Sequence, residues 1–120
     1  MEGFLQSLKF ESKDIQESVC KLIGSKAKFR GKHKKWWKTQ TLYWRGVEIK
    51  RNSQEYQDLL DRAYQCMYDQ SESFRNALKA SMNSTLTHSM GKKNKNETIL
   101  TVSEFCSRLT NLRDYGKLSF

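Results

Sequence analysis

Three residues near the start of the chain are spaced so that they could do chemistry together. Glu2, Gln6 and Lys9 stand at positions i, i+4 and i+7, which on an α-helix of 3.6 residues per turn is one row along one face. A carboxylate in such a row could act as a general acid, a base or a nucleophile. A lysine beside it could bind phosphate or change the pKa of the carboxylate. The polar face of an ordinary amphipathic helix has the same spacing, so this alternative stays open.

The second candidate is a basic segment with aromatic residues near its end. Between residues 26 and 38 there are seven lysines and arginines and no acidic residue. Such cations neutralise phosphates, and exposed rings stack on nucleic-acid bases. Six residues are therefore expected to contact phosphate or nucleic acid: Lys32, Lys34, Lys35, Trp36, Trp37 and Lys38.

Two other interpretations of this segment stay open. Runs of charge often form a solvated loop that only keeps a chain in solution. Each tryptophan ring, like that of Trp44 in the Tyr43-Trp44-Arg45 run that follows, could instead be an anchor in the core. An extended chain points neighbouring side chains to opposite sides. Trp36 and Trp37 therefore cannot both be buried on one side, and one of them is expected to face a ligand.

The third candidate is the pair His88 and Ser89. The imidazole could serve as a base and the hydroxyl as a hydrogen-bond donor, but no Gly-x-Ser-x-Gly elbow surrounds the serine. A histidine with a purely structural role is the alternative. Neither a phosphate-binding glycine loop nor a dinucleotide-binding glycine fingerprint nor metal-ligand spacing occurs in the sequence. We therefore expect no cofactor and no metal.

The length and charge of the chain limit the kind of protein it can be. Its 120 residues suit one domain spanning residues 1–120, and its net charge of +9 favours polyanionic partners. No apolar stretch reaches the roughly 20 residues that span a bilayer, and the start lacks the pattern of a signal peptide. We therefore expect no membrane contact and a cytoplasmic location. Cys20, Cys66 and Cys106 are far apart, which favours free thiols buried in the core.

The hydrophobic pattern predicts a mainly helical α+β fold with one small β-hairpin. Two β-prone runs, 41–44 and 47–49, flank Arg45-Gly46 and predict this hairpin. Segment 26–38 is expected to pass from a helix into a loop. Helices are expected over five segments: 2–10, 12–24, 53–69, 71–82 and 101–115.

Capping residues indicate where these helices begin and end. Ser12 and Ser71 are expected N-caps, and capping boxes are expected at Asn52–Glu55 and Thr101–Glu104. A frayed tail is expected from Gly116 onward. The buried face of the second helix is expected to consist of four residues: Ile15, Val19, Leu22 and Ile23.

The opening run Glu2–Phe10 resembles the signature helix of the NADAR family, written roughly as Val/Met-Glu-x-x-x-Gln-x-x-Lys-Phe. Later segments follow in a similar order: Arg51 with Glu55-Tyr56, residues 74–78, residues 85–89 and a closing helix over residues 104–113. The resemblance covers nearly the whole chain. It looks like a short, basic, phage-type variant that lacks the segment which the family carries before its signature helix.

The resemblance implies a mostly helical pocket that cleaves an N-glycosidic bond. The implied substrates are ADP-ribosylated or related N-ribosyl compounds, including ADP-ribosyl-guanine in nucleic acid. Glu2 would then be the catalytic carboxylate, and five residues would bind the substrate: Gln6, Lys9, Arg51, His88 and Ser89.

The missing segment keeps a second function open, because in the family it builds one wall of the pocket. Without that wall, the chain is expected to be a non-catalytic basic module of the same fold. Such a module would bind nucleic acid, an acidic host protein or a second copy of itself. For a protein encoded by a phage, either function would be performed in the host cytoplasm.

Overall fold

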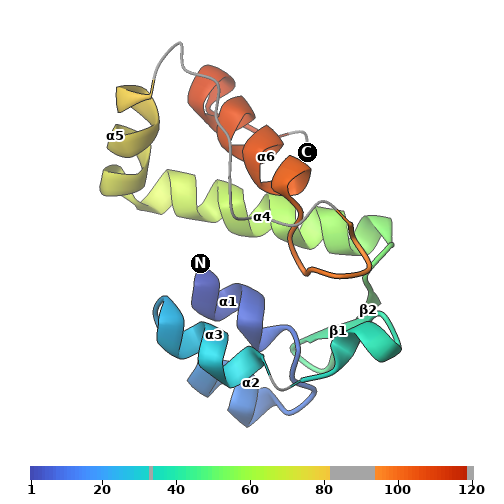
Figure 1. Ribbon diagram of the computed structural model, residues 1–120. Coiled ribbons are helices and arrows are strands. Elements are labelled where there is room, and N and C mark those ends of the chain that lie inside the picture. The colour runs from blue at the N-terminus through green and yellow to red at the C-terminus, as the bar shows by residue number, and fades with distance from the viewer. Residues whose placement is uncertain (33, 82–93, 119–120) are drawn as a thin grey trace. The chain divides into compact units, whose positions relative to one another are not determined.

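The computed structural model describes residues 1–32, 34–81 and 94–118. Two compact units make up the chain: Met1–Tyr56 with Lys95–Ile99, and Gln57–Asn94 with Leu100–Phe120. Helices account for most of the described residues and one two-stranded antiparallel sheet for the rest of the regular structure (Figure 1). The predicted fold class, mainly helical α+β with a small hairpin, is confirmed. That the two units form one domain stays a prediction.

The first unit begins with three short helices that pack together (Figure 1): α1 (Glu2–Ser7), α2 (Lys13–Cys20) and α3 (Ser25–Gly31). Helix α1 ends three residues earlier than the predicted 2–10. Leu5 and Leu8 fix it to the core. Gly3 allows its close approach to α2, because a Cβ atom there would lie 2.4 Å from the carbonyl oxygen of Leu22 and 2.5 Å from that of Cys20.

Helix α2 begins as predicted but ends early. The Ser12 hydroxyl accepts a hydrogen bond from the Ile15 amide, 3.5 Å away, so Ser12 is confirmed as its N-cap. The chain leaves the helix after Cys20, so the residues that follow cannot share a face with those inside it. The predicted buried stripe is therefore wrong in part, since Val19 is fully buried while Ile23 is 84% exposed.

The hairpin lies where the sequence places it. A 3-10 helix, η1 (Trp36–Lys38), precedes strands β1 (Thr41–Trp44) and β2 (Val47–Lys50). The strands pair antiparallel, with Trp44 opposite Val47. Arg45 and Gly46 between them have φ angles of 51° and 83°, the left-handed conformation that a tight two-residue turn requires. The Tyr43 amide donates to the Leu8 carbonyl at 2.8 Å and so joins β1 to the end of α1.

Helix α4 (Gln54–Gln70) starts in the first unit and continues in the second. The Ser53 hydroxyl accepts a hydrogen bond from the Tyr56 amide at 3.2 Å. The predicted box at Asn52–Glu55 is therefore wrong by one residue, because the serine beside Asn52 takes the capping position.

The second unit also contains α5 (Glu72–Ala80) and α6 (Val102–Tyr115). Ser71 caps α5, and Thr101 and Glu104 form a complete capping box at the start of α6, both as predicted. Four buried residues form a core cluster in the second unit: Tyr64, Leu78, Leu112 and Leu118.

The tail is held further than the predicted fraying allows. Gly116 ends α6 with a φ of 69°. The Leu118 amide then donates to the Gln65 side chain at 2.8 Å, and Leu118 is buried. Fraying from Gly116 is therefore wrong for residues 116–118.

The cysteines are free thiols, but they do not fill the core. Cys20 and Cys66 are exposed, and Cys106 is partly buried. The prediction of core thiols is therefore wrong, because Cys20 follows the buried Val19 and points about 100° away around the helix. Within the part of the chain that the structure describes, no helix has the length and apolar composition needed to cross a membrane.

Candidate functional site

The predicted helical row of Glu2, Gln6 and Lys9 is confirmed in part, because α1 carries only Glu2 and Gln6 and ends before Lys9. The Gln6 side-chain amide donates to a Glu2 carboxylate oxygen at 2.8 Å. Gln6 is only 8% exposed, and its side chain lies directly against Gly31 of α3. Gln6 thus orients the Glu2 carboxylate and fills the contact between α1 and α3.

Lys9 follows α1 and reaches a different environment. Its side chain is partly buried, and this loss of solvent lowers its pKa, while the nearby negative charge of Glu2 raises the pKa and opposes part of that change. Lys9 lines a cavity of about 160 Å³, which we call the lysine cavity. Its lining consists of Lys9, Lys34, Lys35, Trp36, Thr39, Thr41 and Tyr43.

The lysine cavity is built from η1 with the two lysines before it, from β1, and from Lys9, which follows α1. Thr41 and Tyr43 are two residues apart on β1, so they lie on the same face of the strand. Gln40 connects η1 to β1 with a φ of 54°. The hydrogen bond from the Tyr43 amide to the Leu8 carbonyl holds Lys9 beside the strand.

The chemistry of this lining suits a small oxyanion. Three ammonium groups and three hydroxyl-bearing side chains surround the space, and among the described residues no aspartate or glutamate lines it. The Thr41 hydroxyl is held in place, because it donates to the Thr39 carbonyl at 3.1 Å and accepts from the Lys50 ammonium at 2.8 Å. Cations and hydroxyls in this arrangement neutralise and hydrogen-bond a phosphate group.

The two neighbouring tryptophans differ in exposure, although they lie in the 3-10 helix η1 and not in the extended chain that the prediction assumed. Trp36 is 7% exposed and lines the lysine cavity, whereas Trp37 is 51% exposed. The Lys38 ammonium lies 5.8 Å from the centre of the Trp37 ring. Lys32 is held at the end of α3, 5.0 Å from the ring of Phe29. The structure thus brings together Lys34, Lys35 and Trp36 of the six predicted contacts, with Trp37 and Lys38 next to them in η1.

Other predicted site residues lie elsewhere. Arg51 is fully buried, and its Nε donates to the Thr98 carbonyl at 2.9 Å while its guanidinium lies 4.9 Å from the centre of the Tyr56 ring. It therefore holds segment 95–99 in the first unit rather than lining a cavity that a substrate could enter. His88 and Ser89 lie outside the described residues.

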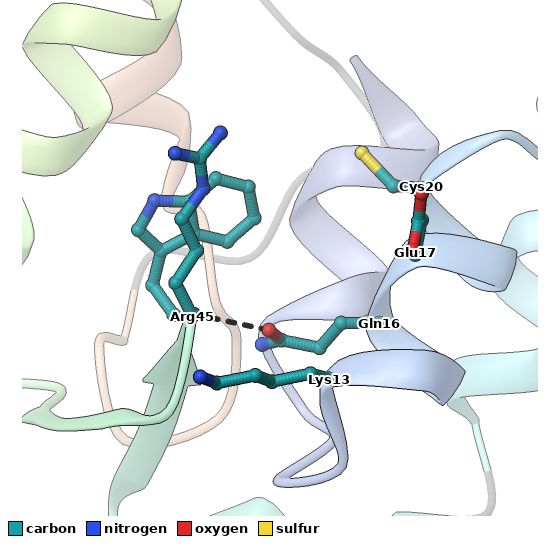
Figure 2. Close-up of a pocket in the computed structure, with 6 residues that line it drawn as sticks. Lys13, Gln16, Glu17, Cys20 and Arg45 are labelled. Atoms are coloured by element: carbon teal, nitrogen blue, oxygen red, sulfur yellow. Dashed lines mark hydrogen bonds between the residues drawn. The ribbon is translucent and has the colours of Figure 1, made fainter.

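A second cavity, of about 460 Å³, lies between α2 and the hairpin turn, and we call it the turn cavity (Figure 2). Its lining consists of Lys13, Gln16, Glu17, Cys20, Trp44 and Arg45. The sequence draws attention to Trp44 and Arg45 as an aromatic-basic pair. It contains no signal that α2 packs beside them.

A metal ion requires a cluster of ligand side chains such as His, Cys, Asp and Glu. Within residues 1–32, 34–81 and 94–118, no group of three or more His, Cys, Asp or Glu residues is placed to hold an ion. The charged groups that line both cavities are mainly lysine and arginine, which bind anions.

Comparison with known proteins identifies the chain's relatives. The family model described as bacteriophage protein GP30.3 matches residues 1–114. A protein of Enterobacteria phage T4, named as an uncharacterized 17.1 kDa protein in the Gp30-rIII intergenic region, is 36% identical over 116 residues. Those residues cover 95% of this chain and 76% of the T4 protein. No solved structure is significantly similar to the chain.

These matches overturn the resemblance to the NADAR family. The matched family spans nearly the whole chain and is a different one. The apparent signature is a spacing of polar residues that any amphipathic helix shares, and α1 carries only its first two members, Glu2 and Gln6. N-glycosidase activity was implied by that resemblance alone and loses its basis with it. The expectation that the sequence is of phage type is confirmed.

Proposed function

The chain belongs to the bacteriophage GP30.3 family, and we propose that it is a basic module that binds the phosphate backbone of nucleic acid through the lysine cavity. The observation that carries this proposal is the position of Lys9. Its ammonium is partly withdrawn from water and shares one small space with Lys34 and Lys35.

The energetics of Lys9 favour an anionic ligand. Removing an ammonium from water is costly unless an opposite charge compensates. Glu2 supplies part of this compensation, but its carboxylate is also hydrogen-bonded to Gln6. A phosphate in the lysine cavity would meet Lys9, Lys34 and Lys35 at once. It would thereby offset both the desolvation of Lys9 and the repulsion among the three like charges.

Trp37 indicates which kind of nucleic acid suits this surface. Trp37 directly follows Trp36, which lines the lysine cavity. Its ring is half-exposed, and the Lys38 ammonium lies beside it. Exposed rings next to cations stack on unpaired bases, which a duplex does not offer. We therefore expect a preference for single strands, and for a phage protein the ligand would be viral or host nucleic acid in the host cytoplasm.

The test is a titration of a fluorescein-labelled single-stranded oligonucleotide with a 5′-hydroxyl end, followed by fluorescence anisotropy between about 50 and 200 mM salt. The site variant is Lys34→Gln with Lys35→Gln. The matched control is Lys79→Gln with Lys117→Gln, which removes two exposed lysines from the second unit. Both variants lose the same net charge.

We expect the wild-type affinity to fall with salt along a slope of log K against log salt of about −0.7 for each phosphate contacted. The site variant should bind about tenfold more weakly, a difference of about 1.4 kcal/mol, and its slope should be shallower by about 0.7. The control should stay near the wild type. Equal losses in the two variants, or no wild-type binding, would refute the proposal.

A further inference from the structure

We propose that the turn cavity is a second and separate binding site, which takes a nucleotide: the base lies against Trp44 and Arg45, and the phosphate meets Lys13 and Arg45. Figure 2 shows the Lys13 side chain reaching from α2 toward the hairpin turn that carries Arg45, with Glu17 and Cys20 further along α2. The inference does not depend on the function proposed for the lysine cavity.

The two cavities are on opposite faces of β1. Thr41 and Tyr43 line the lysine cavity, and Trp44 lines the turn cavity. Successive side chains of a strand point to opposite sides, so Trp44 is directed away from the face that carries Thr41 and Tyr43. The two cavities are therefore separate sites, and a ligand in one does not reach the lining of the other.

Gln16 makes the floor of the turn cavity rigid. It is 4% exposed, its side-chain nitrogen donates to the carbonyls of Tyr43 and Ser7, and its side-chain oxygen accepts the Arg45 amide at 3.1 Å (Figure 2). Every polar atom of this buried amide group is thus bonded within the first unit. The turn is held against α2 at a fixed distance, which leaves the cavity open without a ligand.

Arg45 is an unusual residue for its backbone position. Its φ of 51° is the left-handed conformation, which asparagine or glycine adopts more easily than arginine. Residues held in such conformations cluster where their side chains are used. The Arg45 guanidinium lies 5.2 Å from the centre of the Trp44 ring, so the turn presents a cation and an indole together.

Gly46 brings a second cation to the same place. A Cβ atom at Gly46 would lie 2.8 Å from Cε of Lys13 and 3.5 Å from its Nζ. The Lys13 side chain therefore lies across the glycine, and Figure 2 shows it reaching toward the turn below Arg45. Without a side chain at Gly46, the Lys13 side chain can lie against the backbone of the turn that carries Arg45.

The lining selects for a planar anion of nucleotide size. Two cations attract a phosphate, and a paired guanidinium and indole stack on an aromatic ring. The Glu17 carboxylate across the cavity can accept a hydrogen bond from the amino group of a base. About 460 Å³ is within the range of small-molecule sites, roughly 300–1,000 Å³, and is far larger than inorganic phosphate needs.

The test is isothermal titration of the protein with nucleoside 5′-monophosphates, with nucleosides that lack the phosphate, and with inorganic phosphate. A second arm compares oligonucleotides with and without a 5′-phosphate, because a strand end offers the same chemistry as a free nucleotide. Binding of the monophosphates marks a free nucleotide as the ligand. If the 5′-phosphate increases the affinity for the oligonucleotide while the monophosphates do not bind, the ligand is the end of a strand.

The decisive variant is Arg45→Asn, which removes the guanidinium but suits the left-handed turn. We expect its melting temperature to equal or exceed that of the wild type and its affinity for the phosphate-bearing ligand to fall at least tenfold. Lys13→Met keeps the aliphatic stem over Gly46 and removes the charge. It should weaken the monophosphate severalfold and leave any nucleoside binding unchanged.

The lysine cavity supplies the control that separates this proposal from the previous one. Lys34→Gln with Lys35→Gln should leave monophosphate binding unchanged, and Arg45→Asn should leave the affinity for a 5′-hydroxyl oligonucleotide unchanged. Wild-type affinity retained in Arg45→Asn, or no binding of either phosphate-bearing ligand at millimolar concentration, would overturn the nucleotide site whatever the oligonucleotide result.

Discussion

Replacing Arg51 by alanine removes a fully buried cation from the first unit. Its Nε donates to the Thr98 carbonyl at 2.9 Å, and its guanidinium lies 4.9 Å from the centre of the Tyr56 ring. The Tyr56 hydroxyl in turn donates to the Ile99 carbonyl. Arg51 and Tyr56 together therefore hold segment Lys95–Ile99 in this unit, although it is far away in the sequence.

The expected cost follows from these contacts. A hydrogen bond from a charged group contributes about 1.5–3 kcal/mol, and a desolvated cation–π contact contributes about 2 kcal/mol. The substitution also removes the desolvation cost of the buried charge, which offsets part of the lost free energy. We expect Arg51→Ala to lower the free energy of unfolding by about 3 kcal/mol, within the range known for disrupting a buried charge network.

Urea unfolding followed by tryptophan fluorescence is the appropriate assay. All three tryptophans, Trp36, Trp37 and Trp44, lie in the first unit, so the signal reports on the unit that contains Arg51. With a slope of about 2 kcal/mol per molar urea, the midpoint should fall by about 1.5 M. The control is Arg62→Ala, an exposed arginine of α4. A midpoint for Arg51→Ala that matches this control would refute the structural role assigned to the buried cation.

Two further substitutions test the contacts of α1 and of the residue after it. Burial lowers the pKa of Lys9, so the unfolded chain binds more protons than the folded one, and stability should rise as pH increases from that lowered pKa toward the value of about 10.4 for a free lysine. Lys9→Met should abolish this rise and raise the melting temperature at pH 7, and it should also weaken oligonucleotide binding. A melting temperature at pH 7 equal to or below that of the wild type would contradict the desolvation assigned to Lys9. Gly3→Ala should destabilise the protein by about 1–3 kcal/mol through overpacking, although alanine is the better helix former by about 1 kcal/mol, because its Cβ would meet backbone carbonyl oxygens 2.4 and 2.5 Å away. A melting temperature that increases in Gly3→Ala would show that α1 and α2 are not packed this closely.

Features encoded by a few neighbouring residues could be predicted from the sequence. Ser12, Ser71 and Thr101 cap helices because a side-chain oxygen can reach an amide three residues ahead without help from the rest of the protein. The hairpin follows from two β-prone runs around Arg45-Gly46. The contrast between Trp36 and Trp37 follows from their adjacency.

Features that depend on distant segments were predicted wrongly or not at all. The four-residue stripe from Ile15 to Ile23 looks like one helical face, but the helix ends at Cys20. The sequence gives Gly3 no special role, yet the approach of α2 makes its missing side chain necessary. The sequence does not reveal the turn cavity, because α2 and the hairpin turn are separate in the sequence and are joined by long-range contacts such as the hydrogen bonds of Gln16.

The candidate site shows the same division. The sequence by itself determines the excess of positive charge, the basic run with its two tryptophans and the local starts of the helices, because charge and capping depend on residue type and short spacing. Only the tertiary structure decides that Lys9 joins Lys34 and Lys35 around one cavity while Arg51 is buried. The physical reason is that burial and the convergence of like charges depend on which distant segments exclude water from one another, and no local pattern records that.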